Sequence, residues 1–368
     1  MKIAILTIPP RLNFGGILQA YALQTVLERN GHDVIVLDKP HERKLPAVRA
    51  FLAYAKRIIL KFVLKKKIRI FEEKYYNETY PIVSQNTQYF IDKYLHTREI
   101  KSLFDIQERD YDAFVVGSDQ IWRRKYNKNI KNSFLFFARK WNVGRYAYAA
   151  SFGTDRWEYS ERERKICSML LKKFAFVGVR EENGKELCEK FLGKCADVVL
   201  DPTLLLSKDD YISLMDFSKS EKYKGKLVCY ILDENEEKKR LINEVSLRLG
   251  LPTIMVNAKW SINEPLSARV QPSVEEWLTA LASAAFVITD SFHGTVFSIL
   301  FERKFLTIGN ESRGLSRMES LLALFGLQDK LVTDFNQYDL DESAIKKEKY
   351  EDFKKASLMH ISFFGKEL

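Results

Sequence analysis

The chain has 368 residues, 46% of them hydrophobic and 13% aromatic, which excludes a disordered protein because such a chain can bury packed cores. Its length exceeds one typical core and predicts two domains of about 150–200 residues each. The formal net charge of +10 favours anionic partners, namely phosphorylated substrates, anionic lipid or nucleic acid, although scattered lysines on a solvated surface give the same total.

The amino terminus and the cysteines give no sign of export or metal binding. Residues 1–10 predict a strand rather than a signal peptide, since they lack an apolar core region and a small-residue cleavage site. No apolar run reaches the length of about 18 residues that a transmembrane helix needs. The four cysteines have no C-x-x-C spacing and favour buried, reduced thiols over a zinc site. We therefore expect a cytoplasmic protein without a metal.

The chain opens with a β-α-β pattern. The expected strand, helix and strand lie at 2–8, 17–30 and 33–37. The loop before the helix contains Asn13, Gly15 and Gly16, and two glycines there suit a backbone that approaches a ligand or another backbone. The spacing is not G-x-G-x-x-G, so no dinucleotide site is predicted. A tight turn without a ligand is the alternative.

Residues 47–76 differ in character from the rest of the chain. Apolar residues recur at helical spacing beside many lysines and arginines, a pattern typical of a helix on a membrane surface or in a partner interface. The alternative, which we favour slightly, is an ordinary surface helix that packs its apolar stripe on the domain. Residues 71–80 are aromatic and charged, and predict a loop or short helix across a ligand cleft.

Polar side chains recur where the predicted strands of the first half end. The strands at 113–116, 145–150, 176–179 and 197–200 are followed by Gly-Ser-Asp-Gln, Ser-Phe-Gly, Arg-Glu and Asp-Pro-Thr. Ligands of open α/β sheets bind at this edge. Because polar residues follow four strands and not just one, the sequence predicts a site built from these strand ends.

A second strand-helix series follows at 227–308. Residues 203–223 resemble a linker because serines and aspartates lie among mixed charges there. The predicted domains are 1–205, carrying the insertion at 47–76, then 206–340, and a terminal helix within 341–368. Both domains are expected to be doubly wound and Rossmann-like, with a cleft between them.

Residues 286–301 form the central motif. A buried strand ends at Thr289, Asp290 and Ser291 are turn and cap residues, and an apolar helix is expected from Thr295. His293 therefore lies at a strand end beside a helix N-terminus, where free N–H groups favour anions. His293 is a candidate proton donor or acceptor. A histidine hydrogen-bonded in a turn is the alternative.

Several other residues are candidates with their own alternatives. Arg180 suits a carboxylate or phosphate, or else pairs with Glu181 or a neighbouring aspartate. Arg313 and Arg317 can clamp a phosphate, or form surface salt bridges. Asp119 can orient a sugar hydroxyl or act as a base, or only cap a helix. From these residues alone, the prediction is a two-domain α/β enzyme with an anionic small substrate.

Six motifs in order carry a family resemblance. They are N-F-G-G-I-L-Q-A-Y-A-L-Q (13–24), V-G-S-D-Q-I-W (116–122), A-S-F-G (150–153), V-R-E (179–181), D-P-T (201–203) and T-D-S-F-H-G (289–294). The set resembles the polysaccharide pyruvyl transferase family, and the resemblance spans residues 3–327. The resemblance implies two Rossmann-like domains in a GT-B-like arrangement. It also implies transfer of the pyruvyl group of phosphoenolpyruvate (PEP) to two sugar hydroxyls, giving a cyclic ketal and phosphate, with no cofactor besides PEP as co-substrate.

The resemblance also assigns roles to residues. His293 would do the acid-base work, and Arg180 would bind the carboxylate or phosphate of PEP. Substrate would further contact the following residues: Ser291, Gly294 and Thr295 on the phosphate side, and Asn13, Gly15, Gly16, Ser118, Asp119, Ser151 and Phe152 on the acceptor side. Some family members carry arginine at the position of Ser291, which leaves open how much phosphate binding moves to Arg313 or Arg317.

We therefore expect an enzyme of capsule or exopolysaccharide assembly. Its acceptor would be a polyprenyl-phosphate-linked glycan, and the basic helix at 47–67 would rest on the inner face of the plasma membrane. One rival is a GT-B-like glycosyltransferase that uses a nucleotide sugar. The other is a non-enzymatic basic protein that binds anions, membrane or nucleic acid; it gives no reason for polar residues at so many strand ends, and nucleic acid is not expected as a partner.

Overall fold

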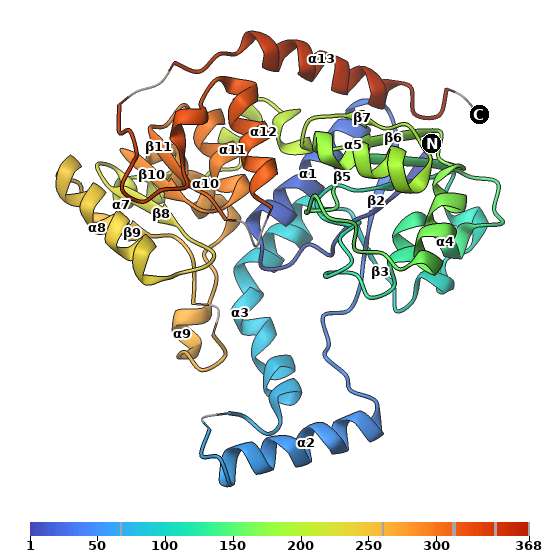
Figure 1. The fold of residues 1–368 in the computed structure, drawn as a ribbon, viewed down its shortest axis with the longest axis horizontal. Helices are drawn as coiled ribbons and strands as arrows, with labels where there is room; N and C mark the ends of the chain where they lie inside the picture. The colour runs from blue at the N-terminus through green and yellow to red at the C-terminus, as the bar shows by residue number, and fades with distance from the viewer. Residues whose placement is uncertain (67, 260, 311–313, 342–343, 367–368) are drawn as a thin grey trace.

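Two parallel β-sheets organise the molecule (Figure 1). The computed structural model describes residues 1–66, 68–259, 261–310, 314–341 and 344–366. Over these residues the first sheet has seven strands in the order β3-β2-β1-β4-β5-β6-β7, and the second has five in the order β12-β11-β10-β8-β9. The strands are β1 Lys2–Leu6, β2 Asp33–Asp38, β3 Thr97–Glu99, β4 Ala113–Val116, β5 Gly144–Ala150, β6 Phe176–Val179, β7 Asp197–Val198, β8 Leu227–Tyr230, β9 Thr253–Met255, β10 Phe286–Thr289, β11 Phe305–Ile308 and β12 Leu331–Val332.

Helices cover both faces of the first sheet because its strands are apolar on both sides. Ile3 and Ile5 of β1 belong to one buried cluster, and Ala4 and Leu6 belong to another, as expected of a parallel sheet. The α-helices are α1 Phe14–Arg29, α2 Ala47–Phe62, α3 Glu72–Tyr94, α4 Glu161–Leu171, α5 Glu182–Leu187, α6 Lys208–Ile212, α7 Ser220–Tyr223, α8 Glu236–Leu249, α9 Leu266–Arg269, α10 Val274–Ser283, α11 Phe292–Leu300, α12 Leu315–Phe325 and α13 Glu348–Ser362.

The strand orders identify both units as doubly wound. The first six strands follow the 3-2-1-4-5-6 order of dinucleotide-binding folds, and the second sheet, numbered within its own unit, follows 2-1-3-4-5. The predicted fold class, α/β with two Rossmann-like units in a GT-B-like arrangement, is confirmed. The domain limits near 205 and 340 stay a prediction. Among the described helices, none is both long and apolar enough to cross a membrane.

The two units are fixed to each other by aromatic packing and by the terminal helix. Phe14, in the first turn of α1, stacks on Trp277 of α10 with ring centroids 5.2 Å apart, and it also contacts Tyr230 of β8 at 5.9 Å. Helix α13 passes over both units (Figure 1), and its Ser357 hydroxyl accepts a 3.1 Å hydrogen bond from the backbone N–H of Leu200. The start of α1 is therefore held against the second unit.

The linker expected at 203–223 is instead an ordered helical connection. Tyr211 and Tyr223 are buried in it, and the Tyr211 hydroxyl donates a 2.8 Å hydrogen bond to the Thr203 carbonyl. The polar residues that suggested a linker are helix caps: Ser207 and Asp210 form a capping box at the start of α6. Sequence composition alone does not separate caps from a linker.

Two expectations for the insertion are wrong. Residues 71–80 are not a short crossing element but the first part of the 23-residue helix α3, which extends from the body and carries α2 at its end (Figure 1). Helix α2 also has no buried residue, so it does not pack its apolar stripe on the domain. The insertion is an arm, not a cover for the cleft.

Candidate active site

A cavity of about 430 Å³ lies where the two units face each other. Its lining includes residues that follow β1, β4, β8 and β10. These are the strands at which each sheet reverses its order, and ligands bind beside such switch points in α/β proteins. We call it the first cavity; its lining residues are Ile8, Asn13, Asp119, Gln120, Tyr126, Leu232, Asp290, Ser291, Phe292, His293, Arg317 and Met318.

The wall from the first unit begins at the N-terminus of α1. The helix starts at Phe14, three residues earlier than expected, because the Asn13 side chain caps it by accepting hydrogen bonds from the N–H groups of Gly15 at 3.1 Å and Gly16 at 3.4 Å. A β-carbon on Gly15 would lie 2.0 Å from Nδ1 of His293. The close approach predicted for this turn is therefore made to a side chain of the other unit.

The opposite wall is the N-terminus of α11. This helix also begins earlier than expected, at Phe292, with Ser291 as its cap; the Ser291 hydroxyl accepts a 3.4 Å hydrogen bond from the Gly294 N–H. His293 thus lies in the first turn and is 6% exposed. By helix geometry, the N–H groups of Phe292 and His293 have no intrahelical acceptor, so they are the backbone donors available to an anion.

Two expected phosphate ligands in α11 face the interior instead. The Thr295 hydroxyl contacts the Ser291 carbonyl at 3.1 Å and the Thr307 hydroxyl at 2.8 Å, and it is fully buried. Gly294 packs against β10, where a β-carbon would lie 2.2 Å from the Thr289 hydroxyl. These residues shape the helix start, and the geometry does not bring them to the first cavity.

A buried charged cluster links the two walls. Asp201 Oδ2 lies 2.9 Å from a terminal nitrogen of Arg180 and 3.7 Å from Nε2 of His293. Asp119 Oδ1 lies 3.6 Å from Arg180 and 3.7 Å from Arg317. The neighbouring aspartate considered as an ion-pair partner for Arg180 is therefore present. Even so, the three guanidinium nitrogens of Arg180 and Nε2 of His293 are buried and make no directed hydrogen bond to the described residues.

Burial and neighbouring charges shift the pKa values of several groups in this cluster. Burial alone would raise the pKa of Asp201, but the charge of Arg180 and the nearby His293 ring hold that pKa well below its usual range. Burial, and then the like charge of Arg180, lower the pKa of Arg317. Burial also raises the pKa of Glu181, despite the two guanidinium groups beside it. Two buried guanidinium groups therefore lie beside the carboxyl groups of Asp119, Asp201 and Glu181.

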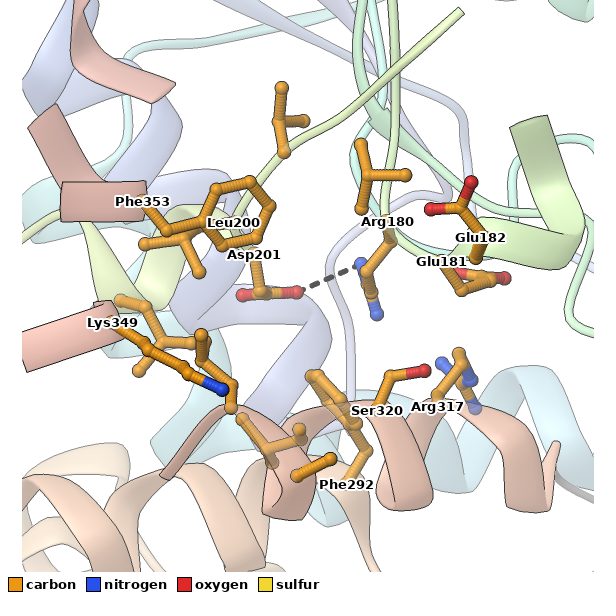
Figure 2. Close-up of a pocket in the computed structure, with 16 residues that line it drawn as sticks. Arg180, Glu181, Glu182, Leu200, Asp201, Phe292, Arg317, Ser320, Lys349 and Phe353 are labelled. Carbon is orange, nitrogen blue, oxygen red and sulfur yellow. Dashed lines mark ion pairs between the residues drawn. The ribbon is translucent and has the colours of Figure 1, made fainter. Parts of the chain in front are cut away.

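Phe292 separates the first cavity from a second one. Its ring centroid lies 5.1 Å from the guanidinium carbon of Arg180 and 5.4 Å from that of Arg317. Phe292 and Arg317 also line the second cavity, which has a volume of about 310 Å³. Figure 2 shows this cavity, with the Arg180–Asp201 ion pair, Arg317 and Ser320 from α12, and Lys349 and Phe353 from α13.

The remaining predicted residues divide between the site and the core. Asp119 lines the first cavity with a left-handed backbone, at φ 62°. Ser118 is fully buried against α1, where its N–H donates to the Gln19 side chain at 3.2 Å. The Ser151 hydroxyl donates to Glu181, and Phe152 packs on Trp122. Arg313 lies outside the described residues. Ser118, Ser151 and Phe152 therefore support the site from behind.

Sequence reasoning missed three contributors. Asp201 was visible in the D-P-T motif but had no assigned role, since only the fold shows that it meets His293. Phe292 precedes the histidine, before the helix expected from Thr295, and has no predicted role. Asp290 was seen as a turn residue, yet its carboxylate accepts hydrogen bonds from the Leu232 N–H at 2.6 Å and the Lys238 ammonium at 2.6 Å. It thereby ties the ends of β8 and β10 together beside the cavity.

Fold and site together define a two-unit α/β protein with a cleft that contains buried arginines and a histidine. The model of the polysaccharide pyruvyl transferase family matches residues 13–312, which is well over half of the chain. The chain belongs to the polysaccharide pyruvyl transferase family, and the family implies a transferase.

Other comparisons give weaker likenesses. No curated protein sequence matches this chain. Among solved structures, a putative UDP-N-acetylglucosamine 2-epimerase from Listeria monocytogenes is 12% identical with a TM-score of 0.47, covering 100% of this chain and 88% of its own. The Neisseria meningitidis UDP-GlcNAc 2-epimerase bound to UDP-GlcNAc is 10% identical with a TM-score of 0.49, covering 97% and 94%. The E. coli heptosyltransferase WaaC with ADP is 13% identical with a TM-score of 0.38, covering 86% and 90%.

Proposed function

We propose that this transferase moves the pyruvyl group of PEP onto two hydroxyls of a glycan, forming a cyclic ketal and releasing phosphate during capsule or exopolysaccharide assembly. The observation that carries the proposal is the buried cluster in which Arg180, Asp201 and His293 meet beside the first cavity. Membership of the family supports the same reaction class.

The charges of PEP suit the groups around the first cavity. PEP has a carboxylate and a phosphate, and guanidinium groups bind both through charge-assisted hydrogen bonds. Arg317 lines the cavity. Arg180 lines the second cavity and not the first, but its buried nitrogens make no directed hydrogen bonds to described residues, and it lies beside Asp201. The N-terminus of α11 adds backbone N–H donors. We assign PEP to the first cavity because His293 lines it.

The reaction requires three proton transfers and two C–O bonds to the acceptor. One acceptor hydroxyl loses its proton and adds to the central carbon of PEP, while the methylene carbon takes a proton and becomes a methyl group. The C–O bond to phosphate then breaks, and the second hydroxyl adds to the resulting cation and loses its proton. His293 is the group that exchanges protons with these atoms. Asp201, whose Oδ2 lies 3.7 Å from Nε2 of His293, is a positioning residue that orients the imidazole ring.

Binding of PEP can be tested before the acceptor is known. The melting temperature of the purified protein is measured in the presence of PEP, of inorganic phosphate, and of UDP- and GDP-sugars. The proposal predicts that PEP raises the melting temperature in a concentration-dependent way, and that Arg317→Lys weakens this effect. Stabilisation by a nucleotide sugar but not by PEP would instead support a glycosyltransferase.

Turnover is tested with a glycan prepared for the purpose. Ketals are acid-labile, so surface glycan from the producing organism is treated with mild acid to remove pyruvate and then offered as acceptor. The expected result is phosphate release from PEP together with acid-labile pyruvate on the glycan. Phosphate release without any glycan-bound pyruvate would contradict ketal formation.

A further inference from the structure

The apolar stripe of α2 faces away from the protein. Val48, Phe51 and Phe62 are 74%, 73% and 66% exposed, and the spacing i, i+3, i+14 places them on one side of the helix. Leu52, Ile59 and Val63 continue the same stripe and are also exposed. A surface helix normally turns such a stripe toward its own core. Here the stripe is presented outward.

The opposite side of α2 is what attaches the helix to the arm. Arg57 donates hydrogen bonds of 2.6 and 2.8 Å to the Glu73 carboxylate of α3. Tyr54 packs edge-on against Phe71 with ring centroids 5.1 Å apart. Because Arg57 and Tyr54 lie across the helix from Val48, these contacts fix the apolar stripe in its outward orientation.

The positive charge of the chain is concentrated in the same arm. Residues 43–71 contain ten of the 59 lysines and arginines and none of the 49 aspartates and glutamates. The rest of the chain therefore carries 49 charges of each sign. Arg49 and Lys56 border the outward stripe at helical spacing. The net charge of +10 is thus a local property of this arm.

We propose that the outward face of α2 binds an anionic lipid bilayer, with its apolar side chains at the boundary of headgroups and acyl chains and its basic residues on the lipid phosphates. An exposed apolar stripe bordered by lysine and arginine is the arrangement that lies in a membrane interface. A second copy of the chain fits poorly, because a symmetric contact would bring two such basic segments together. Nucleic acid leaves the apolar stripe uncovered.

The arm also places the bilayer relative to the first cavity. Helix α3 reaches from α2 to the junction of the two units, where the Asn86 side chain and the Val83 carbonyl bond the backbone of Gln271 at 2.8 and 3.1 Å. A protein held through α2 therefore keeps its body off the bilayer, joined to it by the outer part of α3. This inference goes beyond the proposed function and needs neither PEP nor an acceptor.

The test is flotation of the full chain with vesicles of phosphatidylcholine containing one quarter phosphatidylglycerol. The wild-type protein should float with these vesicles and bind pure phosphatidylcholine vesicles at least tenfold more weakly. Phe51→Ser/Phe62→Ser should lower the partition coefficient at least tenfold. The matched control is Phe104→Ser/Phe217→Ser, which removes two phenylalanines that are each 61% exposed elsewhere, and it should bind like the wild type.

Each other outcome overturns the proposal. Equal flotation of Phe51→Ser/Phe62→Ser and the wild type would show that α2 does not insert. Failure of the wild type to float would exclude a bilayer as the partner of α2. This conclusion would hold even if analytical ultracentrifugation then showed dimers formed through the stripe, or if the protein bound DNA. Because flotation contains no substrate, it separates this inference from the pyruvyl transfer. Unchanged melting temperatures verify that each variant is folded.

Discussion

His293 and Asp201 belong to different parts of the chain and meet across the cleft, with Nε2 of the histidine 3.7 Å from Oδ2 of the aspartate. The same oxygen lies 2.9 Å from Arg180. One buried carboxylate thereby joins the residue proposed to move protons to a residue proposed to bind PEP. The contact depends on aromatic packing of Phe14 against Trp277, which brings the start of α1 to the second unit.

Asp201→Asn should lower stability in a pH-dependent manner. The carboxyl has a pKa of about 3.8 when unperturbed and a lower one in the folded protein. Its contribution is therefore complete above about pH 5, begins to decline near the unfolded pKa and is lost as the pH falls through the folded value. Removing one partner of a buried ion pair costs about 3–5 kcal/mol. Urea unfolding at pH 7, 5 and 3.5 should give a large difference in the free energy of unfolding between wild type and variant, and this difference should become smaller only at the lowest pH. A difference that is the same at all three pH values would contradict this role of Asp201.

Gly15→Ala should displace the His293 ring, because the added β-carbon would lie 2.0 Å from Nδ1. A shift of about 1 Å in a reacting group can cost about 100-fold in rate, so kcat should fall by about that factor. Gly16→Ala is the matched control, since its β-carbon would meet nothing closer than 3.7 Å. Steady-state phosphate release compares the two; equal rates would show that Gly15 has no special role.

Arg317→Lys should raise the KM for PEP about tenfold or more, because lysine cannot make the bidentate contacts of a guanidinium group. Arg269→Lys serves as a control: Arg269 is also buried, but its side chain points to the Tyr75 hydroxyl at 3.4 Å, away from the first cavity. The KM of both variants is measured by titration with PEP. Equal KM values for Arg317→Lys and the wild type would remove Arg317 from the PEP site.

Lys349→Ala tests which cavity holds PEP. Lys349 lines the second cavity and not the first, so the variant should keep the wild-type KM for PEP within about twofold, a change below about 0.4 kcal/mol. A tenfold rise in KM would assign PEP to the second cavity, which both Arg180 and Arg317 line.

Local pattern was enough to predict the strands and most of the helices around the site. The strand-turn-helix at 286–301 is confirmed, since buried β-branched residues, a serine cap and an apolar helix are all local signals. Both α1 and α11 begin earlier than predicted, because Asn13 and Ser291 cap helices whose first turns contain glycine. Because glycine is a loop signal in sequence, the predicted start of both helices falls after the glycines.

Contacts between distant segments could not be predicted from the sequence. The meeting of Asp201 with His293 depends on how the two units pack, and no spacing encodes it. Likewise, the periodicity of α2 shows an apolar stripe but not its direction. That direction is set by Arg57 and Glu73, which are 16 positions apart and appear in sequence as ordinary surface charges.

The most direct test of the central claim is turnover by His293→Gln with PEP and the acid-treated glycan. Wild-type protein should release phosphate only when the glycan is present, and the variant should be at least about 100-fold slower. His96→Gln, at a histidine whose side chain is 64% exposed and paired with Glu28, should retain the wild-type rate. Near-normal turnover by His293→Gln, or phosphate release by the wild type that is independent of glycan, would contradict pyruvyl transfer through His293.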